Sequence, residues 1–329
     1  MPKIILISVI AYREKYLAEA IRSYYETAAH PENLRFSVIS EQMHEWQHAD
    51  LSFIPSSQIV YRKYDLSEYR GIMWSRTKTV DVEFEYDYIL YTCGHNVFTP
   101  HWDTYALADM RSALSLSSKP ILLNMGPEYE YLDNGSHSYA PSGDLAVRYR
   151  TTIGPDYVPG YGFPNDYLVE VPGKDGLLEA IYIQFSWVFT TRECVDDVPL
   201  NPDVNYHAEE IWMTIHAFDR GWDLFHTQRI MYYHDTHKMY PGEEMSRTIS
   251  HRPWSDLNKD AFWKQSDETE RALNKLLSGN GGISKETINK FCAKTGLNPK
   301  WCVPIDDYAS IGLERHGEQF RLDAPIISD

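Results

Sequence analysis

Residues 3–40 read KIILISVIAYREKYLAEAIRSYYETAAHPENLRFSVIS, and this stretch decides the fold. It opens with a continuous β-branched run (3–11), which is typical of a strand covered on both faces. Residues 12–29 then place apolar side chains at helical spacing, the turn HPEN (30–33) ends that helix, and LRFSVIS (34–40) is a second strand. A strand, a helix and a strand in this order predict a right-handed βαβ unit with parallel strands.

The same alternation of strands and helices continues along the chain. It predicts an α/β fold with an open, mostly parallel sheet flanked by helices. The further strands are expected at residues 57–64, 86–92, 119–124, 182–190 and 224–233, and the further helices at residues 71–84, 102–116 and 209–220.

Composition divides the chain into a sheet-forming part, residues 1–240, and a polar helical C-terminal appendage, residues 241–329. Within the first part, residues 125–175 are rich in Tyr, Pro, Gly and Asp. Long irregular segments are commonly functional, and the tyrosines argue against disorder, so we expect an ordered insertion beside the site. In the appendage, GNGG (279–282) marks a linker before a short helix (284–295) whose first residue is a capping serine.

Charge and cysteine content narrow the function classes. The formal net charge of −16 repels phosphate groups, which argues against non-specific binding to nucleic acid. The four cysteines form no Cys-x-x-Cys pair, and a reducing cytosol is the default for such a chain. The apolar start (3–11) is too short to span a bilayer, and no signal-peptide cleavage site follows it. We therefore expect a cytoplasmic protein that does not contact a membrane.

Three polar clusters follow predicted strands: AYRE (11–14), CGH (93–95) and HDTH (234–237). Ligands bind at the carboxyl ends of strands in open α/β sheets, so these clusters mark a candidate site. Neutral imidazole binds divalent transition metals, and His95 and His234 could share one ion. The alternative is that each is an ordinary hydrogen-bonded loop histidine. Cys93, two residues before His95, is either a soft-metal ligand or a small buried thiol.

Carboxylates and arginines extend the candidate site. Glu209 and Glu210 begin a predicted helix, where acidic side chains interact favourably with the helix dipole. Alternatively, one of the two carboxylates faces a pocket, where it binds substrate hydroxyls or assists proton transfer. Arg13, Arg70 and Arg76 could cradle a diphosphate, although a solvated arginine is commoner for any one of them. The chain has no Walker-type loop and no G-x-G-x-x-G after its first strand, which argues against NTPases and classical dinucleotide enzymes.

Taken in order, several blocks resemble the glycosyltransferases related to the cytoplasmic N-acetylglucosaminyltransferase that modifies hydroxyproline. The resemblance covers about residues 3–240, and the order of the blocks is more specific than any one of them. The blocks are SVIAYREKYLAEAI (8–21), HPENLRFSVISEQ (30–42), RGIMWSR (70–76), LYTCGHNVFTPHWD (90–103), VPLNPDVNYHAEEIWMTIHAFDRGWDLF (198–225) and YYHDTH (232–237).

This resemblance implies a GT-A type, Rossmann-like fold and transfer of a sugar, GlcNAc or similar, from a UDP-sugar to an acceptor hydroxyl with retention of configuration. It also implies a metal site at His95, His234 and Cys93, because Cys93-Gly94-His95 stands where the family has Asp-Ser-His. The expected ion is Mn²⁺ or Mg²⁺. Cys93 departs from the family pattern, since both ions prefer oxygen ligands.

The resemblance further assigns roles to individual residues. Asp103, Glu209 and Glu210 are the candidates for holding donor or acceptor hydroxyls. The residues expected to contact the donor are Ala11, Tyr12, Arg13, Gln42, Arg70, Arg76, Gly94, Trp102 and Trp222.

The acceptor stays open at this stage. It could be a protein, a glycan, or a hydroxymethylated nucleobase of the kind found in viral DNA. Two other classes also remain: a glycosyltransferase-like binding protein that has lost catalysis, and a metal hydrolase that uses His95, His234 and a carboxylate.

Overall fold

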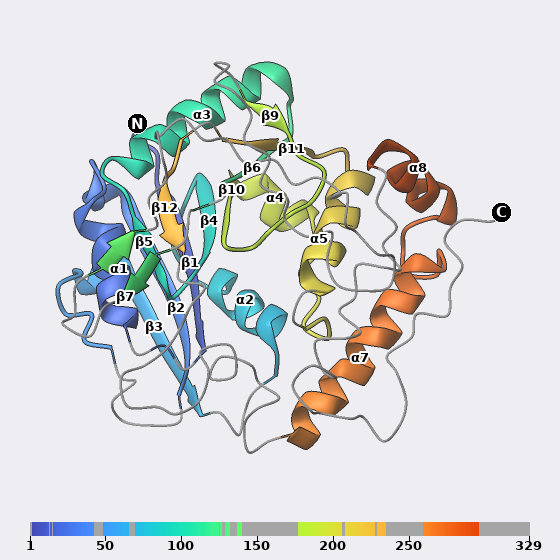
Figure 1. Cartoon of the computed structure of the whole chain (residues 1–329), viewed down its shortest axis with the longest axis horizontal. Helices are drawn as coiled ribbons and strands as arrows, with labels where there is room; N and C mark the ends of the chain where they lie inside the picture. The colour runs from blue at the N-terminus through green and yellow to red at the C-terminus, as the bar shows by residue number, and fades with distance from the viewer. Residues whose placement is uncertain are drawn as a thin grey trace.

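An eight-stranded sheet forms the centre of the molecule in the computed structural model (Figure 1). The structure describes residues 2–12, 14, 16–42, 49–65, 70–124, 126, 129–131, 137–139, 177–205, 208–227, 229–234 and 259–295. The strand order is β3-β2-β1-β4-β10-β6-β11-β9. The strands are β1 (Ile5–Tyr12), β2 (Leu34–Gln42), β3 (Ile59–Asp65), β4 (Tyr88–Cys93), β6 (Pro120–Leu123), β9 (Leu178–Glu179), β10 (Trp187–Thr191) and β11 (Asp223–His226).

The sheet is mostly parallel, as the sequence predicts. β1 pairs in parallel with β2 and with β4, and β2 pairs in parallel with β3. β6 and β11 are parallel to each other, whereas β10 runs antiparallel between β4 and β6, and β9 is an antiparallel edge strand. The carboxyl ends of β1, β2, β3 and β4 therefore share one edge of the sheet.

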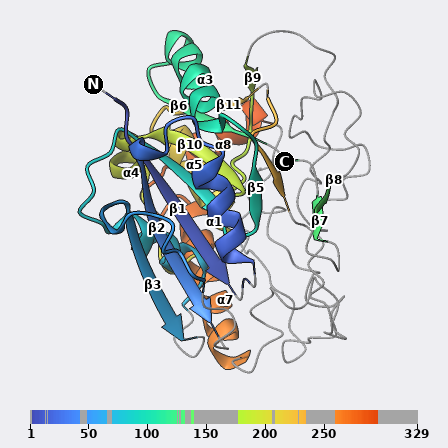
Figure 2. The ribbon, with the colours of Figure 1, turned by 90° about the vertical axis from the view of Figure 1, so that its left-hand side faces the viewer.

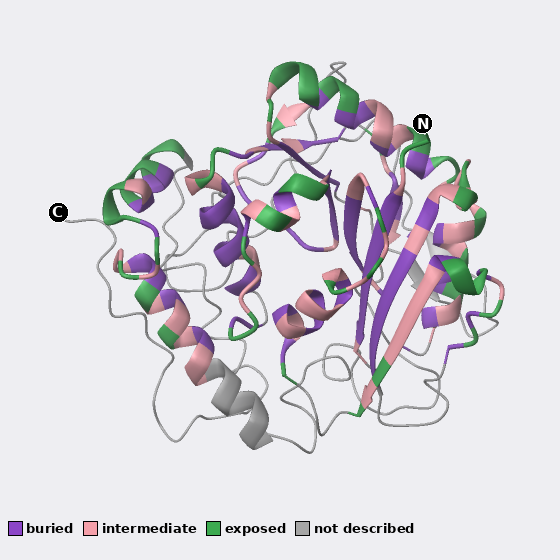
Figure 3. Ribbon diagram, turned by 180° about the vertical axis from the view of Figure 1, so that it is seen from behind, coloured by how far each residue is buried: buried purple, intermediate pink, exposed green. Residues whose placement is uncertain are grey.

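Helices cover both faces of the sheet, because side chains along a strand alternate between two cores. Leu6 belongs to the core formed with α2, α5, α7 and α8, whereas Ile5, Ile7 and Val9 belong to the core formed with α1 and α3. Figure 2 shows α1 beside β1, and Figure 3 shows the buried central strands. The helices are α1 (Leu17–Glu26), α2 (Ile72–Val80), α3 (Trp102–Leu116), α4 (Arg192–Asp197), α5 (Ala208–Asp219), α7 (Lys259–Leu277) and α8 (Lys285–Thr295).

The predicted strand at residues 224–233 is in fact two strands. β11 ends at His226, and the chain then turns away to form β12 (Tyr232–His234), which pairs antiparallel with β5 (Asn96–Phe98). The Asn124 side chain holds this turn, since its amide accepts the N–H of Met231 at 3.2 Å and donates to the carbonyl oxygen of Arg229 at 2.5 Å. We call β5 and β12 the β5–β12 ribbon.

The C-terminal segment is helical where it is described. The predicted serine cap is confirmed, because the Thr287 N–H donates to the Ser284 hydroxyl at 3.1 Å before α8. Most of residues 125–175 lies outside the described residues, apart from the hairpin of β7 (Tyr129–Tyr131) and β8 (His137–Tyr139). Among the helices that the structure describes, none has the length and apolar character needed to cross a membrane.

Candidate active site

The candidate site lies where the strand order reverses. β1 pairs with β2 on one side and with β4 on the other. The chain adds β2 and then β3 on the first side of β1, and then crosses over to add β4 on the second side. Such a point leaves a crevice at the carboxyl ends of the two strands, which is the usual ligand position in open α/β sheets. Tyr12 ends β1 there, half-buried, and Cys93 ends β4.

His95 and His234 come together at this edge although they are far apart in the sequence. The β5–β12 ribbon places His234 opposite Asn96, the neighbour of His95. Their Nε2 atoms are 3.1 Å apart and their ring centroids 5.0 Å apart. Two imidazole nitrogens bound to one ion at about 2.1 Å, at roughly a right angle, would also lie about 3 Å apart. The geometry thus suits two neighbouring ligands of one ion.

Glu14 orients His95, and the sequence analysis assigned it no role of its own. Its Oε1 atom lies 2.7 Å from His95 Nδ1, and its side chain is only 6% exposed. Because a carboxylate accepts hydrogen bonds, Nδ1 carries the proton and the Nε2 lone pair faces His234. A carboxylate behind a histidine is the arrangement commonly found around metal-binding imidazoles. No spacing rule in the sequence connects residues 14 and 95.

Cys93 does not join the two histidines. Its Sγ atom lies 4.0 Å from the carbonyl oxygen of Phe185, which also accepts a hydrogen bond from Arg76 Nη2 at 3.3 Å. Within the part of the chain that the structure describes, no group of three or more His, Cys, Asp or Glu side chains is arranged to hold a metal ion. The expected third ligand is therefore not supplied by Cys93 in this arrangement.

Gly94 explains why the cysteine and the histidine are separated by a glycine. A Cβ atom at this position would lie 2.9 Å from the Cβ of Ala11 and 2.9 Å from Cδ1 of Leu17. Both distances are shorter than real Cβ contacts, and Ala11 is itself buried at the end of β1. The glycine lets the turn after β4 pack directly onto β1 and α1.

Arg76 and Glu209 are two buried side chains whose charges influence each other, and both have unused hydrogen-bonding atoms within the described part of the chain. Arg76 is fully buried over the Phe185 ring at 4.0 Å, and among the described residues its Nε and Nη1 atoms have no partner. Glu209 is 3% exposed, and its Oε2 atom has no partner within the same described part. Burial raises the pKa of Glu209 to about 7, opposed by the charge of Arg76, and burial also lowers the pKa of Arg76. Buried polar groups left unpaired in this way are typical of sites that receive a polar ligand.

Glu210 points in another direction from Glu209, as neighbouring helix residues must. It accepts the Phe185 N–H at 3.0 Å and lies 3.4 Å from the Tyr182 hydroxyl. These contacts tie α5 to the segment that leads into β10. Both carboxyl oxygens of Glu210 are engaged in these contacts, and its catalytic assignment stays a prediction.

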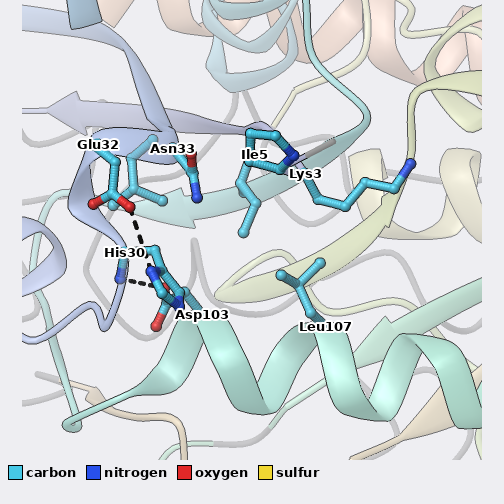
Figure 4. A pocket seen from close by; sticks show the side chains of 9 residues that line it. Lys3, Ile5, His30, Glu32, Asn33, Asp103 and Leu107 are labelled. Carbon is cyan, nitrogen blue, oxygen red and sulfur yellow. Dashed lines mark hydrogen bonds and ion pairs between the residues drawn. The ribbon is translucent and has the colours of Figure 1, made fainter.

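Asp103 is the clearest correction to the sequence analysis. Its carboxylate accepts the backbone N–H groups of Ala29 at 2.8 Å and His30 at 2.9 Å, so it fixes the loop between α1 and β2. It also lines a cavity of about 560 Å³ beside Ile5, at the amino-terminal ends of β1 and β2 (Figure 4). That edge of the sheet is opposite the one that carries His95, so we do not retain Asp103 as a catalytic candidate.

Both tryptophans expected at the donor serve the fold instead. Trp102 is fully buried and donates its indole N–H to the Tyr24 carbonyl oxygen at 2.9 Å. Trp222 is 4% exposed and donates to Asp197 Oδ2 at 2.8 Å. Neither indole offers a free face to a nucleotide.

The remaining predicted donor residues are placed only in part. Arg70 is exposed, with its guanidinium 5.6 Å from the ring centroid of Trp74. Gln42 ends β2, but its side chain is not among the described ones, and Arg13 lies outside the described residues. These assignments stay predictions.

Comparison with known proteins decides the class of enzyme. The family model described as "Glycosyltransferase (GlcNAc)" matches residues 40–320. The chain belongs to this family. Membership in this family favours sugar transfer over the metal-hydrolase alternative. No curated protein sequence matches the chain significantly.

One solved structure shows the same fold at low sequence identity. GalNAc-T7, crystallised with UDP, GalNAc and Mn²⁺, matches with a TM-score of 0.53 and 12% identity over 94% of this chain and 58% of that one. The chain thus spans less than two thirds of the length of this structural relative. S. aureus TarS matches with a TM-score of 0.47 and 11% identity over 88% of this chain and 43% of that one. The match to GalNAc-T7 supports the GT-A type fold that the resemblance implies.

Proposed function

We propose that this glycosyltransferase moves a sugar, GlcNAc or a close relative, from a UDP-sugar to an acceptor hydroxyl, with a divalent ion held by His95 and His234. The observation that carries the proposal is the 3.1 Å approach of the two Nε2 atoms at the carboxyl edge of the sheet, with Glu14 behind His95. The family description names GlcNAc, and GalNAc-T7 was crystallised with UDP, GalNAc and Mn²⁺, which supports the donor class and the ion.

The pair of imidazoles fits Mn²⁺ better than Mg²⁺. Mg²⁺ is a hard ion that keeps oxygen ligands in near-ideal octahedral geometry, whereas imidazole suits transition metals. When bound, such an ion would supply positive charge for the diphosphate leaving group. Further ligands would come from the donor, from water or from residues outside the described part.

The buried side chains of Arg76 and Glu209 are proposed to contact the donor. Within the described part of the chain, Arg76 has unpaired N–H groups for phosphate or sugar oxygens, and Glu209 has an unpaired carboxyl oxygen for a hydroxyl. A carboxyl group with a pKa of about 7 exchanges protons readily near neutral pH, which suits acid–base assistance. Tyr12, Arg13 and Gln42 are proposed to lie on the nucleoside side of the crevice.

Other parts of the proposal are predictions from the sequence. Retention of configuration and the specific relation to the hydroxyproline N-acetylglucosaminyltransferases follow from the resemblance. The cytoplasmic location follows from the cysteine pattern and the start of the chain, and the division into residues 1–240 and 241–329 follows from composition. The acceptor hydroxyl belongs to a protein, a glycan or a modified nucleobase.

The test is UDP release from a panel of UDP-sugars in the presence of Mn²⁺, of Mg²⁺ or of EDTA. We expect turnover with Mn²⁺, weaker turnover with Mg²⁺, and loss with EDTA. His95→Ala should lower turnover by at least about tenfold, because it removes half of the metal-binding pair. His30→Ala is the matched control, since His30 is exposed at the opposite edge of the sheet.

Two outcomes would contradict the proposal in different ways. Near-normal activity of His95→Ala, or full wild-type activity in EDTA, would remove the metal assignment and leave the donor class standing. Absence of turnover and of binding with every UDP-sugar would remove the donor class itself.

A further inference from the structure

The hydroxyl of Tyr24 joins both ends of the turn that carries His95. Tyr24 lies in α1, and its hydroxyl donates to the Cys93 carbonyl oxygen at 2.5 Å. The same oxygen accepts the backbone N–H of Asn96 at 3.3 Å. Cys93 and Asn96 are the residues immediately before and after Gly94 and His95, so one phenolic oxygen fixes the whole turn.

Tyr24 is itself rigidly held. It is fully buried, and its ring centroid lies 4.1 Å from that of Phe98. Its carbonyl oxygen accepts the Trp102 indole N–H at 2.9 Å. Burial raises the pKa of the Tyr24 hydroxyl well above its ordinary value, so the hydroxyl stays protonated and keeps its donor. A phenol can donate one hydrogen bond while accepting another, as both contacts require.

The turn fixes the position of both histidines. His95 lies within it, and Asn96 at its end is the residue that pairs with His234 across the β5–β12 ribbon. The Asn96 side chain is anchored separately, since its Nδ2 atom donates to Thr92 Oγ1 and to the Ser186 carbonyl oxygen, both at 2.8 Å. Only Tyr24, among the contacts of the described residues, reaches both ends of the turn from α1.

We infer that Tyr24 is a positioning residue for the metal-binding pair, acting through the turn from Cys93 to Asn96. The inference rests on the proposed function, because it requires His95 and His234 to bind an ion. Tyr24→Phe keeps the ring and its packing but removes both hydrogen bonds. We expect this change to weaken Mn²⁺ binding by about tenfold, the lower end of what loss of an orienting contact does around metal ligands.

Two neighbouring variants separate positioning from general loss of contacts. Ser23→Ala removes the hydroxyl that accepts the Phe98 N–H at 3.1 Å, so it also loosens α1 from β5 but spares the turn. Tyr25→Phe makes the same chemical change one residue along, where the hydroxyl lies 3.5 Å from Gln58 Oε1, away from the turn. Both controls should bind Mn²⁺ within about twofold of wild type, even where their stability falls.

The experiment measures free Mn²⁺ by electron paramagnetic resonance during titration of each full-length variant, alone and with saturating UDP. The same proteins loaded with Co²⁺ report the geometry of the imidazole pair through their visible absorption bands. Urea unfolding of each variant shows that it is folded. We expect Tyr24→Phe alone to raise the dissociation constant about tenfold and to alter the Co²⁺ spectrum.

The outcomes distinguish this inference from the proposed function. Wild type that binds Mn²⁺, with folded Tyr24→Phe matching it in affinity and Co²⁺ spectrum, would overturn the positioning role only. An equal loss of affinity in Ser23→Ala would also overturn it, because the effect would then follow general loosening of α1. Wild type that binds no Mn²⁺ with or without UDP would overturn the metal site itself.

Discussion

The buried carboxyl group of Glu41 should make the stability of this protein fall as the pH rises from about 4.5 through about 7. Glu41 lies near the end of β2, is 4% exposed, and accepts a hydrogen bond from the Ser75 hydroxyl at 2.5 Å. Its Oε2 atom has no partner among the described residues. Burial raises the pKa of Glu41 to about 7, and the Ser75 hydrogen bond only partly opposes this. The charged form is therefore disfavoured in the folded protein.

The size of the effect follows from the difference between the folded and unfolded pKa values. The unfolded value is 4.5 and the folded value is about 7. A carboxyl group whose pKa is raised by folding contributes its full stability below pH 4.5, and this stability is lost as the pH rises through about 7. Between pH 5 and pH 8 the loss amounts to about 2 kcal/mol.

Glu41→Gln isolates this contribution, because glutamine cannot ionise but still accepts from Ser75. Urea unfolding, followed by tryptophan fluorescence, gives the free energy of unfolding of variant and wild type at pH 5 and pH 8. We expect the variant to gain about 2 kcal/mol relative to wild type on going from pH 5 to pH 8. Glu83→Gln is the control, since Glu83 is exposed and should give no such gain.

One result would refute the reasoning on Glu41. If the difference between variant and wild type were the same at both pH values, the carboxyl group would not be held in its neutral form by burial. The absolute effect of the substitution matters less, because glutamine brings its own unpaired amide group into the same place.

Two further substitutions test the packing around the site and the helical side of the core. Gly94→Ala should lower the free energy of unfolding by about 1–3 kcal/mol and weaken Mn²⁺ binding, because the new methyl group would lie 2.9 Å from the Cβ of Ala11. The control is Gly221→Ala, which has open space around its Cβ and should leave Mn²⁺ binding unchanged. Equal effects of the two substitutions on Mn²⁺ binding would argue against a steric cause. The ring centroids of His216 and Trp212 lie 4.5 Å apart in a tilted arrangement. Burial lowers the pKa of His216 from 6.5 to about 4, so its contribution to stability is lost as the pH falls from 6.5 through about 4. His216→Leu should therefore reduce the loss of stability between pH 7.5 and pH 4.5 by about 2 kcal/mol in urea unfolding, and an unchanged loss would show that His216 does not titrate in the fold.

The histidine pair shows how far the sequence alone reaches into the site. Strand ends are visible in the hydrophobic pattern, and the rule that ligands gather at carboxyl ends singled out His95 and His234. The structure brings their rings together through the β5–β12 ribbon, which the sequence did not show, because residues 224–233 read as one strand. Glu14 and Tyr24 were missed as partners of the turn, since nothing in their spacing links them to residues far along the chain.

One reason explains why the structure places three residues differently from the sequence-based assignments. Asp103, Trp102 and Trp222 are residue types that ligand sites use, and they stood in blocks that resemble a glycosyltransferase family. A carboxylate or an indole N–H serves equally well to satisfy backbone or side-chain groups inside the fold. Which use applies depends on the edge of the sheet and the layer in which the residue lies, and the sequence does not reveal this.

The sequence by itself determined the βαβ start, α3 at residues 102–116 and the mostly parallel sheet, because hydrophobic periodicity is a local property of each segment. The GT-A type was implied only by the resemblance of its ordered blocks to a glycosyltransferase family. Only the tertiary structure decided which polar side chains meet. It paired His95 with His234 and Glu14, left Arg76 and Glu209 buried with unused hydrogen-bonding atoms, and turned Asp103 toward a loop at the far edge. The physical reason is that such contacts depend on strand order and ribbon pairing, which join residues that the chain keeps far apart.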